Sequence, residues 1–125
     1  MDENQLGEKI LGCALKVHKA LGPGLLENAY EACLAHELAK AGLAFERQLT
    51  LPVIYDGIRI DLGYRLDLVV ARLVVIEVKA AAGITDIHRA QILSYLKLGR
   101  YRLGYLLNFN VGMMRDGICR LANGL

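Results

Sequence analysis

The run VVIEVKAAAG, residues 74–83, decides the fold, because it combines the composition of a buried strand with two charged residues, Glu77 and Lys79. Successive side chains of a strand point to opposite faces, so these two residues share a face. A charge on an apolar strand costs free energy unless it is paired, hydrated or bound to a metal ion. The run therefore predicts a strand that carries a carboxylate and an ammonium group side by side. A plain ion pair between them is the alternative interpretation.

A second β-rich run, YRLDLVV, precedes this strand and places Asp67 ten positions before Glu77. The short gap between the two runs predicts an antiparallel hairpin. A three-residue connection at 71–73 would set Asp67 opposite Glu77, whereas a two-residue turn would need a bulge to do so. With the first register, Asp67, Glu77 and Lys79 converge on one side of the hairpin.

Two neighbouring carboxylates repel each other unless a cation lies between them. Mg²⁺ and Mn²⁺ take oxygen ligands and commonly use one or two protein carboxylates together with waters and phosphate oxygens. An adjacent lysine could orient a water, lower its pKa or stabilise charge on a phosphate. Asp67, Glu77 and Lys79 therefore indicate metal-assisted hydrolysis of a phosphodiester.

Hydrophobic periodicity and turn residues place the other elements. They predict helices at about 4–20, 25–42 and 86–100, and strands at 45–55, 101–110 and 117–123. Within this pattern Thr85 is the expected N-cap of the third helix, and Gly42 and Gly99 are the expected helix C-terminal caps. Pro52 marks an edge or a bulge, and Asp56-Gly57 marks a turn. With the hairpin, the order is α-α-β-β-β-α-β-β, which favours a mixed sheet flanked by helices in a single domain, 1–125.

Composition sets wider bounds. The chain has 125 residues, 54% hydrophobic and 22% charged, which is an ordinary globular profile. No apolar run approaches the roughly 20 residues of a membrane span, so we expect no membrane partner. The net charge of +2 is too small to argue for nucleic acid by itself. Three cysteines without CxxC spacing indicate a reducing, cytoplasmic setting.

Two helices offer further candidate residues. His88, Gln91 and Tyr95 lie at i, i+3 and i+7, so they share one face of the helix at 86–100. Glu27 and Tyr30 are three apart in the helix at 25–42, with Glu27 in the first turn, where the macrodipole favours a carboxylate. Gln91 and Tyr95 could instead bond only within the protein, Tyr30 could be a core aromatic, and Glu27 could be no more than a favourable first-turn acid.

The run GLLENAY, residues 24–30, resembles the signature of the GxxExxY family. The pattern D…ExK followed by QxxxY resembles the PD-(D/E)XK nuclease superfamily, to which that family is assigned. The similarity extends from VHKALGPGLLE through YLLNF and covers nearly the whole chain. It implies an α/β (mixed α+β) fold with a restriction-endonuclease-like αβββαβ core, in which a mixed central sheet is flanked by helices.

The resemblance also implies roles for individual residues. Glu27 would be the helical acid of the first motif and would help to hold the metal directly or through water. Asp67 and Glu77 would be the principal ligands of Mg²⁺ or Mn²⁺. Lys79 would complete the catalytic ExK pair, and catalytic Gln91 with Tyr95 would form the accessory QxxxY pair. Helix spacing, and not the resemblance, adds His88 and Tyr30 to Tyr95 as candidate substrate contacts.

Two functions follow as expectations. The first is a metal-dependent nuclease that hydrolyses nucleic-acid phosphodiesters, with DNA favoured on superfamily grounds. The alternative is a catalytically inactive nuclease-fold module that binds nucleic acid, a small ligand or a protein partner. So small a chain has little surface for a separate DNA-grasping domain, so we expect a homo-dimer or targeting by a partner. A structural homo-oligomer is a third alternative, and an apolar C-terminal set would then line the interface: Tyr101, Tyr105, Phe109, Met113 and Met114.

Overall fold

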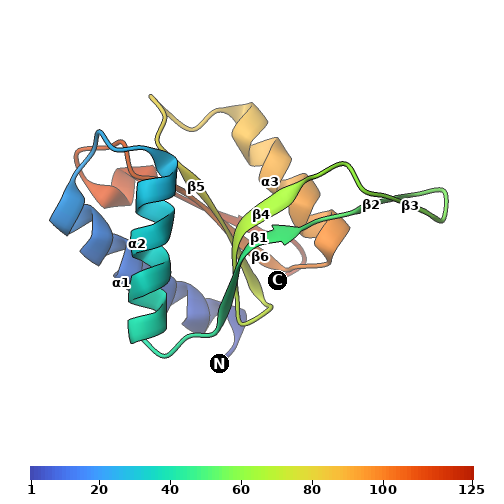
Figure 1. The fold of residues 1–125 in the computed structure, drawn as a ribbon, viewed down its shortest axis with the longest axis horizontal. Coiled ribbons are helices and arrows are strands. Elements are labelled where there is room, and N and C mark those ends of the chain that lie inside the picture. The colour runs from blue at the N-terminus through green and yellow to red at the C-terminus, as the bar shows by residue number, and fades with distance from the viewer.

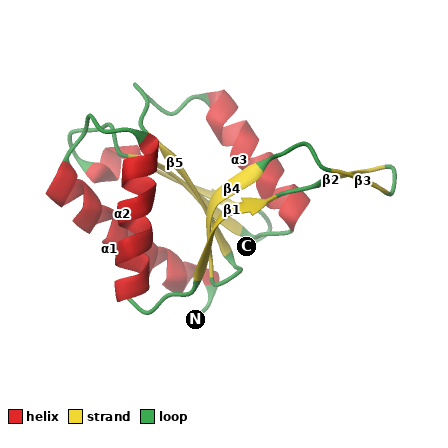
Figure 2. Ribbon diagram, viewed as in Figure 1, coloured by secondary structure: helices red, strands yellow, loops and turns green.

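The computed structural model describes residues 1–125, arranged as a twisted sheet with helices on both faces (Figures 1 and 2). In chain order the elements are α1 Glu3–Leu21, α2 Glu27–Lys40, β1 Phe45–Thr50, β2 Val53–Tyr55, β3 Ile58–Ile60, β4 Arg65–Val70, β5 Val74–Lys79, α3 Asp86–Gly99, β6 Leu103–Asn108, the 3₁₀ turn η1 Met114–Gly117, and β7 Ile118–Ala122. None of the helices combines the length and the apolar character that a membrane crossing requires.

The main sheet has five strands in the order β1-β4-β5-β6-β7. Its only parallel pair is β5 with β6, which α3 connects, and every other neighbouring pair is antiparallel. This arrangement confirms the predicted mixed sheet flanked by helices. The strand that carries Glu77 and Lys79 lies at the centre of the sheet, where neighbouring strands can bring other residues to it from both sides.

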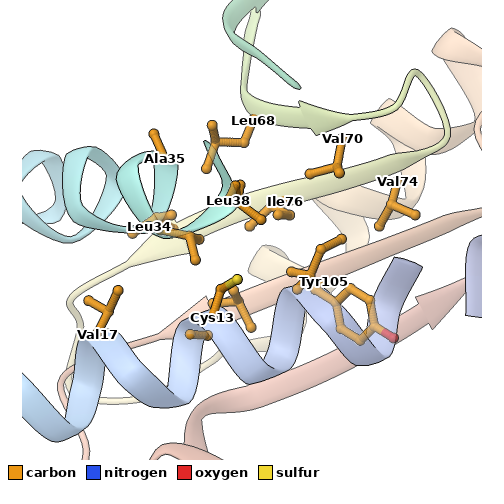
Figure 3. Packing of buried hydrophobic residues seen from close by; sticks show 14 of the residues in the cluster. Cys13, Val17, Leu34, Ala35, Leu38, Leu68, Val70, Val74, Ile76 and Tyr105 are labelled. Carbon is orange, nitrogen blue, oxygen red and sulfur yellow. The ribbon is translucent and has the colours of Figure 1, made fainter. Parts of the chain in front are cut away.

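Helices α1 and α2 cover one face of the sheet through a cluster of 20 buried residues, part of which Figure 3 shows. The apolar side chains of α1 lie at helical spacing, and Leu6, Ile10 and Ala14 are at most 1% exposed. Asp2 begins this helix with a capping box that it shares with Gln5. A smaller cluster of seven buried residues lies between α3 and the opposite face.

The connection between β4 and β5 is the three-residue turn that places the candidate acids in register. Val70 pairs with Val74, and the Leu73 N–H donates to the Val70 carbonyl oxygen at 2.9 Å. Ala71 and Arg72 both adopt left-handed conformations, with φ values of 52° and 58°. The ladder sets Leu68 opposite Ile76, so the next facing positions are Asp67 and Glu77.

The strand expected at 45–55 was wrong in its extent, because the chain leaves the main sheet at residues 51–52. Pro52 has no N–H to donate, and β1 ends before it. Strands β2 and β3 instead form a separate two-stranded arm that projects from the body of the molecule (Figure 1). Its turn is the predicted Asp56-Gly57 pair, whose φ values of 53° and 72° suit a tight hairpin.

The two expected helix caps had different outcomes. Gly42 follows α2 with a φ of 75°, and the Leu43 N–H returns to the Leu38 carbonyl oxygen at 3.0 Å, as a left-handed stop requires. Gly99 is instead the last residue of α3, and the left-handed position falls to Arg100, with a φ of 60°. The Gly99 cap was therefore wrong by one residue. What this position needs is small size, because a Cβ there would collide with the ring of Tyr101.

The apolar C-terminal set does not form the expected interface. Tyr105, Phe109 and Met114 are at most 3% exposed and belong to the cluster under α1 and α2. Tyr101 is half-buried against the cluster under α3, which leaves Met113 as the only exposed member. Apolar residues at these positions are expected both in a buried core and at an interface, so the sequence could not distinguish the two.

Candidate active site

Asp67 and Glu77 meet at the end of the β4–β5 ladder. The Val78 N–H donates to Oδ2 of Asp67 at 2.8 Å, and the Asp67 N–H donates to Oε1 of Glu77 at 3.3 Å. Glu77 is only 7% exposed and follows Val75, which packs in the cluster under α3. Each carboxyl group thus accepts from a backbone N–H of the other strand, at the register expected for a three-residue connection.

Burial raises the pKa of the Glu77 carboxyl, and the neighbouring charge of Asp67 raises it further, to about 9. The positive charge of Lys79 acts in the opposite direction but is the smaller influence. Glu77 therefore carries a proton at neutral pH when no cation is bound. A hard divalent cation fits this donor set, because it would take oxygen ligands from both acids and would favour the ionised form that the proton now suppresses.

Lys79 is half-buried, lies on the same face as Glu77 and forms no ion pair. A plain ion pair with Glu77 is therefore absent from the structure. The end of β5 is held by other groups: the Lys79 carbonyl oxygen accepts from the Phe109 N–H at 2.9 Å, and the Asn108 side-chain amide bonds the backbone N–H and carbonyl oxygen of Ala81, each at 3.1 Å. None of these bonds involves the ammonium group of Lys79, which has no partner in the protein.

Two of the three candidates on α3 are bonded to each other. Gln91 Nε2 donates to the Tyr95 hydroxyl at 3.0 Å. Burial raises the pKa of Tyr95, and the charge of Glu77 raises it further. The ring of Tyr64 lies beside that of Tyr95, with centroids 5.9 Å apart.

His88 is placed differently, because the structure uses it at the start of α3. Its Nδ1 accepts from the Thr85 N–H at 3.2 Å, and the Thr85 hydroxyl accepts from the His88 N–H at 3.2 Å. The imidazole thus completes a cap, with Thr85 as the predicted N-cap. It makes no hydrogen bond to Gln91, to Tyr95 or to either acid.

Glu27 begins α2 and is exposed. With Leu25, Leu26, Asn28 and Ala80 it lines a hollow of about 430 Å³, so it lies beside the C-terminal end of β5. No three histidine, cysteine, aspartate or glutamate side chains gather closely enough to share a metal ion. Glu27 therefore does not gather with Asp67 and Glu77 in this arrangement.

Tyr30 has no exposed surface. Its ring stacks on Phe109 with centroids 4.7 Å apart, and its hydroxyl donates to the Gly22 carbonyl oxygen at 2.6 Å and accepts from the Leu25 N–H at 3.1 Å. Its placement is that of the core aromatic and does not suit a substrate contact. The hydroxyl ties down the turn that leads to Glu27.

The sequence did not predict a series of polar contacts that runs from Glu31 on α2 through Gln48 to Asp67. Glu31 is only 6% exposed and accepts from Nε and Nη2 of Arg47 at 3.1 and 2.9 Å. Gln48 Nε2 donates to Glu31 Oε1 at 2.8 Å and to Asp67 Oδ1 at 3.4 Å. The available signal was the position of Glu31, four residues after Glu27 and on the same side of α2.

Comparison with known proteins agrees with this geometry. A family model described as the PD-(D/E)XK nuclease superfamily matches residues 4–121. No curated protein and no solved structure matches significantly. The matched range contains every residue of the candidate site and all five strands of the main sheet except the last residue of β7.

Proposed function

Because the chain belongs to the PD-(D/E)XK nuclease superfamily, we propose that it is a nuclease that uses Mg²⁺ or Mn²⁺ to hydrolyse nucleic-acid phosphodiesters, DNA in preference to RNA. The observation that carries the proposal is the contact between Asp67 and Glu77 beside the unpaired ammonium group of Lys79. Within the superfamily we place the chain in the GxxExxY family, on the strength of GLLENAY at 24–30.

In the proposed site Asp67 and Glu77 hold the divalent ion, and Glu27 contributes through a water. When bound, the ion supplies Lewis-acid polarisation of the phosphate and a lower pKa for the attacking water. The protein adds the ammonium group of Lys79, which positions that water and stabilises the negative charge that grows on the phosphate. An unpaired and half-buried lysine suits this task, because no acid competes for its charge.

Two side chains of α3, Gln91 and Tyr95, support the same chemistry. Gln91 is exposed, and its side chain orients the attacking water or Lys79. Tyr95 fixes Gln91 through the 3.0 Å bond to its amide. A tyrosine hydroxyl is protonated at neutral pH, so Tyr95 adds no negative charge near the phosphate.

The test is cleavage of plasmid, single-stranded and branched DNA, with RNA in parallel, in Mg²⁺ or Mn²⁺. The wild type is compared with Glu77→Gln and Lys79→Met, and with Glu46→Gln as the matched control. Glu46 lies on the neighbouring edge strand and forms only an exposed pair with Arg72 at 3.7 Å. We expect cleavage by the wild type and the control alone. Equal cleavage by all four proteins would contradict the assignment.

The second candidate function is a module that binds without cleaving. It is favoured by one observation: only two acids meet at the site, and one of them is protonated at neutral pH. Calorimetric titration with Mn²⁺, with and without DNA, separates the two functions. Mn²⁺ binding that Asp67→Asn abolishes supports the nuclease. DNA binding that depends neither on Mn²⁺ nor on Asp67 supports the module.

We further propose that the chain acts as a homo-dimer or with a targeting partner in a reducing, cytoplasmic compartment. The β2–β3 arm supports the first point, since an isolated two-stranded hairpin is marginal in water and this one exposes Ile54, Tyr55 and Ile58 by 55–71%. Three unpaired cysteines support the second. Native mass measurement tests assembly, and a strict monomer would leave only the external partner.

A further inference from the structure

The main sheet is locally distorted where β1 passes Asp67. The β1–β4 register pairs Arg47 with Leu68 and Leu49 with Leu66, and it leaves Gln48 and Asp67 as the unpaired facing positions between them. Gln48 adopts a φ of 52°, an uncommon conformation for a residue other than glycine. Strained backbone of this kind costs free energy, and it persists only where surrounding contacts fix it.

The distortion changes which face each strand presents. On β1, Phe45 packs under α1 and α2, whereas Leu49 packs under α3, although a separation of four residues would keep them on one face of a regular strand. On β4, Leu68 and Leu66 show the same switch on either side of Asp67. Both strands therefore shift their alternation at one place, and that place is the candidate metal ligand.

The contacts that fix Gln48 run from buried Glu31 to Asp67. The side-chain amide nitrogen Nε2 of Gln48 lies 2.8 Å from Glu31 Oε1 and 3.4 Å from Asp67 Oδ1. Arg47 holds the other oxygen of Glu31 through two N–H groups, so Glu31 is anchored independently of Gln48. The Asp67 carboxylate thus has a donor at each oxygen: the Val78 N–H at Oδ2 and the Gln48 amide at Oδ1.

We propose that Gln48 is a positioning residue, which Glu31 and Arg47 lock in its strained conformation so that its amide fixes the orientation of the Asp67 carboxylate for a divalent cation. This inference rests on the proposed function, because it deepens the metal site. Hydrogen bonds to a metal-ligating carboxylate set its orientation, and their loss typically lowers metal affinity by 10–100-fold. Glu31 acts one step further out, through Gln48.

The first experiment measures Mn²⁺ affinity by calorimetry in a double-mutant cycle of Gln48→Leu and Glu31→Gln. Each protein is checked for folding by thermal melting, with Glu46→Gln as the control on the same strand. We expect Gln48→Leu to bind Mn²⁺ about 10–100-fold more weakly. Glu31→Gln should weaken binding alone but add nothing in the Gln48→Leu background, because both act through one contact. Wild-type affinity in Gln48→Leu, or fully additive losses, would overturn the inference.

The second experiment needs no metal, so it separates this inference from the proposed function. The side-chain amide signals of Gln48 are identified by NMR from their loss in Gln48→Leu. We expect them to shift in both Asp67→Asn and Glu31→Gln, since the amide touches both acids. If neither substitution moves them, the positioning contact is absent whatever the metal result. If both move them and the wild type binds no Mn²⁺, the proposed function fails and the contact stands.

Discussion

Asp67 and Glu77 face each other one position beyond the last paired residues of β4 and β5, and each carboxyl group accepts from a backbone N–H of the neighbouring strand. Two acids in water avoid such contact. Here the raised pKa of Glu77 shows what allows it, because a proton takes the place that a positive charge would fill. A divalent cation that binds both acids would replace that proton.

Glu77→Gln is expected to stabilise the metal-free protein at neutral pH. Below about pH 4.5 Glu77 is protonated in both the folded and the unfolded chain and contributes no pH dependence. Between pH 4.5 and about 9 the unfolded chain loses the proton that the folded chain keeps, so the free energy of unfolding falls as pH rises. Glutamine cannot ionise, which removes this contribution and gains on the order of 1–3 kcal/mol at pH 7.

Urea denaturation at pH 5 and pH 8, with EDTA present, measures this difference. The gap between variant and wild type should widen at pH 8. Glu46→Gln serves as the control, because it removes an exposed carboxyl group on β1 while leaving Glu77 and Lys79 in place. Parallel pH profiles for wild type and Glu77→Gln would show that Glu77 is already ionised in the folded protein.

Mn²⁺ binding is expected to release a proton from Glu77 and to tighten as pH rises toward 9. The ion requires the ionised carboxylate, so binding near pH 7 should liberate about one proton per ion. Calorimetry in two buffers with different heats of ionisation counts the protons. Asp67→Asn should weaken binding at least tenfold, and any binding that Glu77→Gln retains should release none. Wild-type heats that do not depend on the buffer would contradict the exchange.

Lys79→Met is expected to separate metal binding from turnover. Lys79 makes no contact that holds the acids in place, and its positive charge opposes a cation. Removing Lys79 also raises the pKa of Glu77 further, so the proton competes more strongly with the ion, and these two opposing effects should leave Mn²⁺ affinity little changed. Cleavage should fall by about 100-fold or more, as it does when a donor to developing negative charge is removed. A parallel loss of affinity and cleavage would instead give Lys79 a structural role.

Much of the fold follows from the sequence, because its signals are local. The apolar run marks β5 as a buried strand, a three-residue connection is one of the two that the hairpin allows, and Thr85 begins α3 as expected. The arm was missed because an alternating pattern continues through Pro52, and only the three-dimensional course of the chain shows that the strand leaves the main sheet there.

The site was predictable only where a motif concentrates its residues. The bridge from Glu31 to Asp67 joins three elements through a glutamine whose side-chain type carries no signal, and its left-handed backbone arises from tertiary contacts. Tyr30 was ambiguous for a different reason. A tyrosine one turn into a helix suits a core and a binding site equally until its burial is known.

Tyr30→Phe is expected to lower stability without affecting the site. The ring stacking on Phe109 survives, but the bonds to Gly22 and Leu25 are lost, which should cost about 1–3 kcal/mol. Denaturation measures this loss, and Mn²⁺ affinity and the KM for DNA should stay within about twofold of wild type at a temperature where both proteins are folded. A raised KM at unchanged stability would make Tyr30 a substrate contact after all.

The most direct test of the account is a crystal of the wild-type protein soaked in Mn²⁺, with the ion located by its anomalous scattering. One strong peak is expected, and it should lie within about 2.0–2.6 Å of two carboxylate oxygens, one from Asp67 and one from Glu77. A peak at other residues, or acids that remain in direct contact with no peak between them at saturating Mn²⁺, would contradict it.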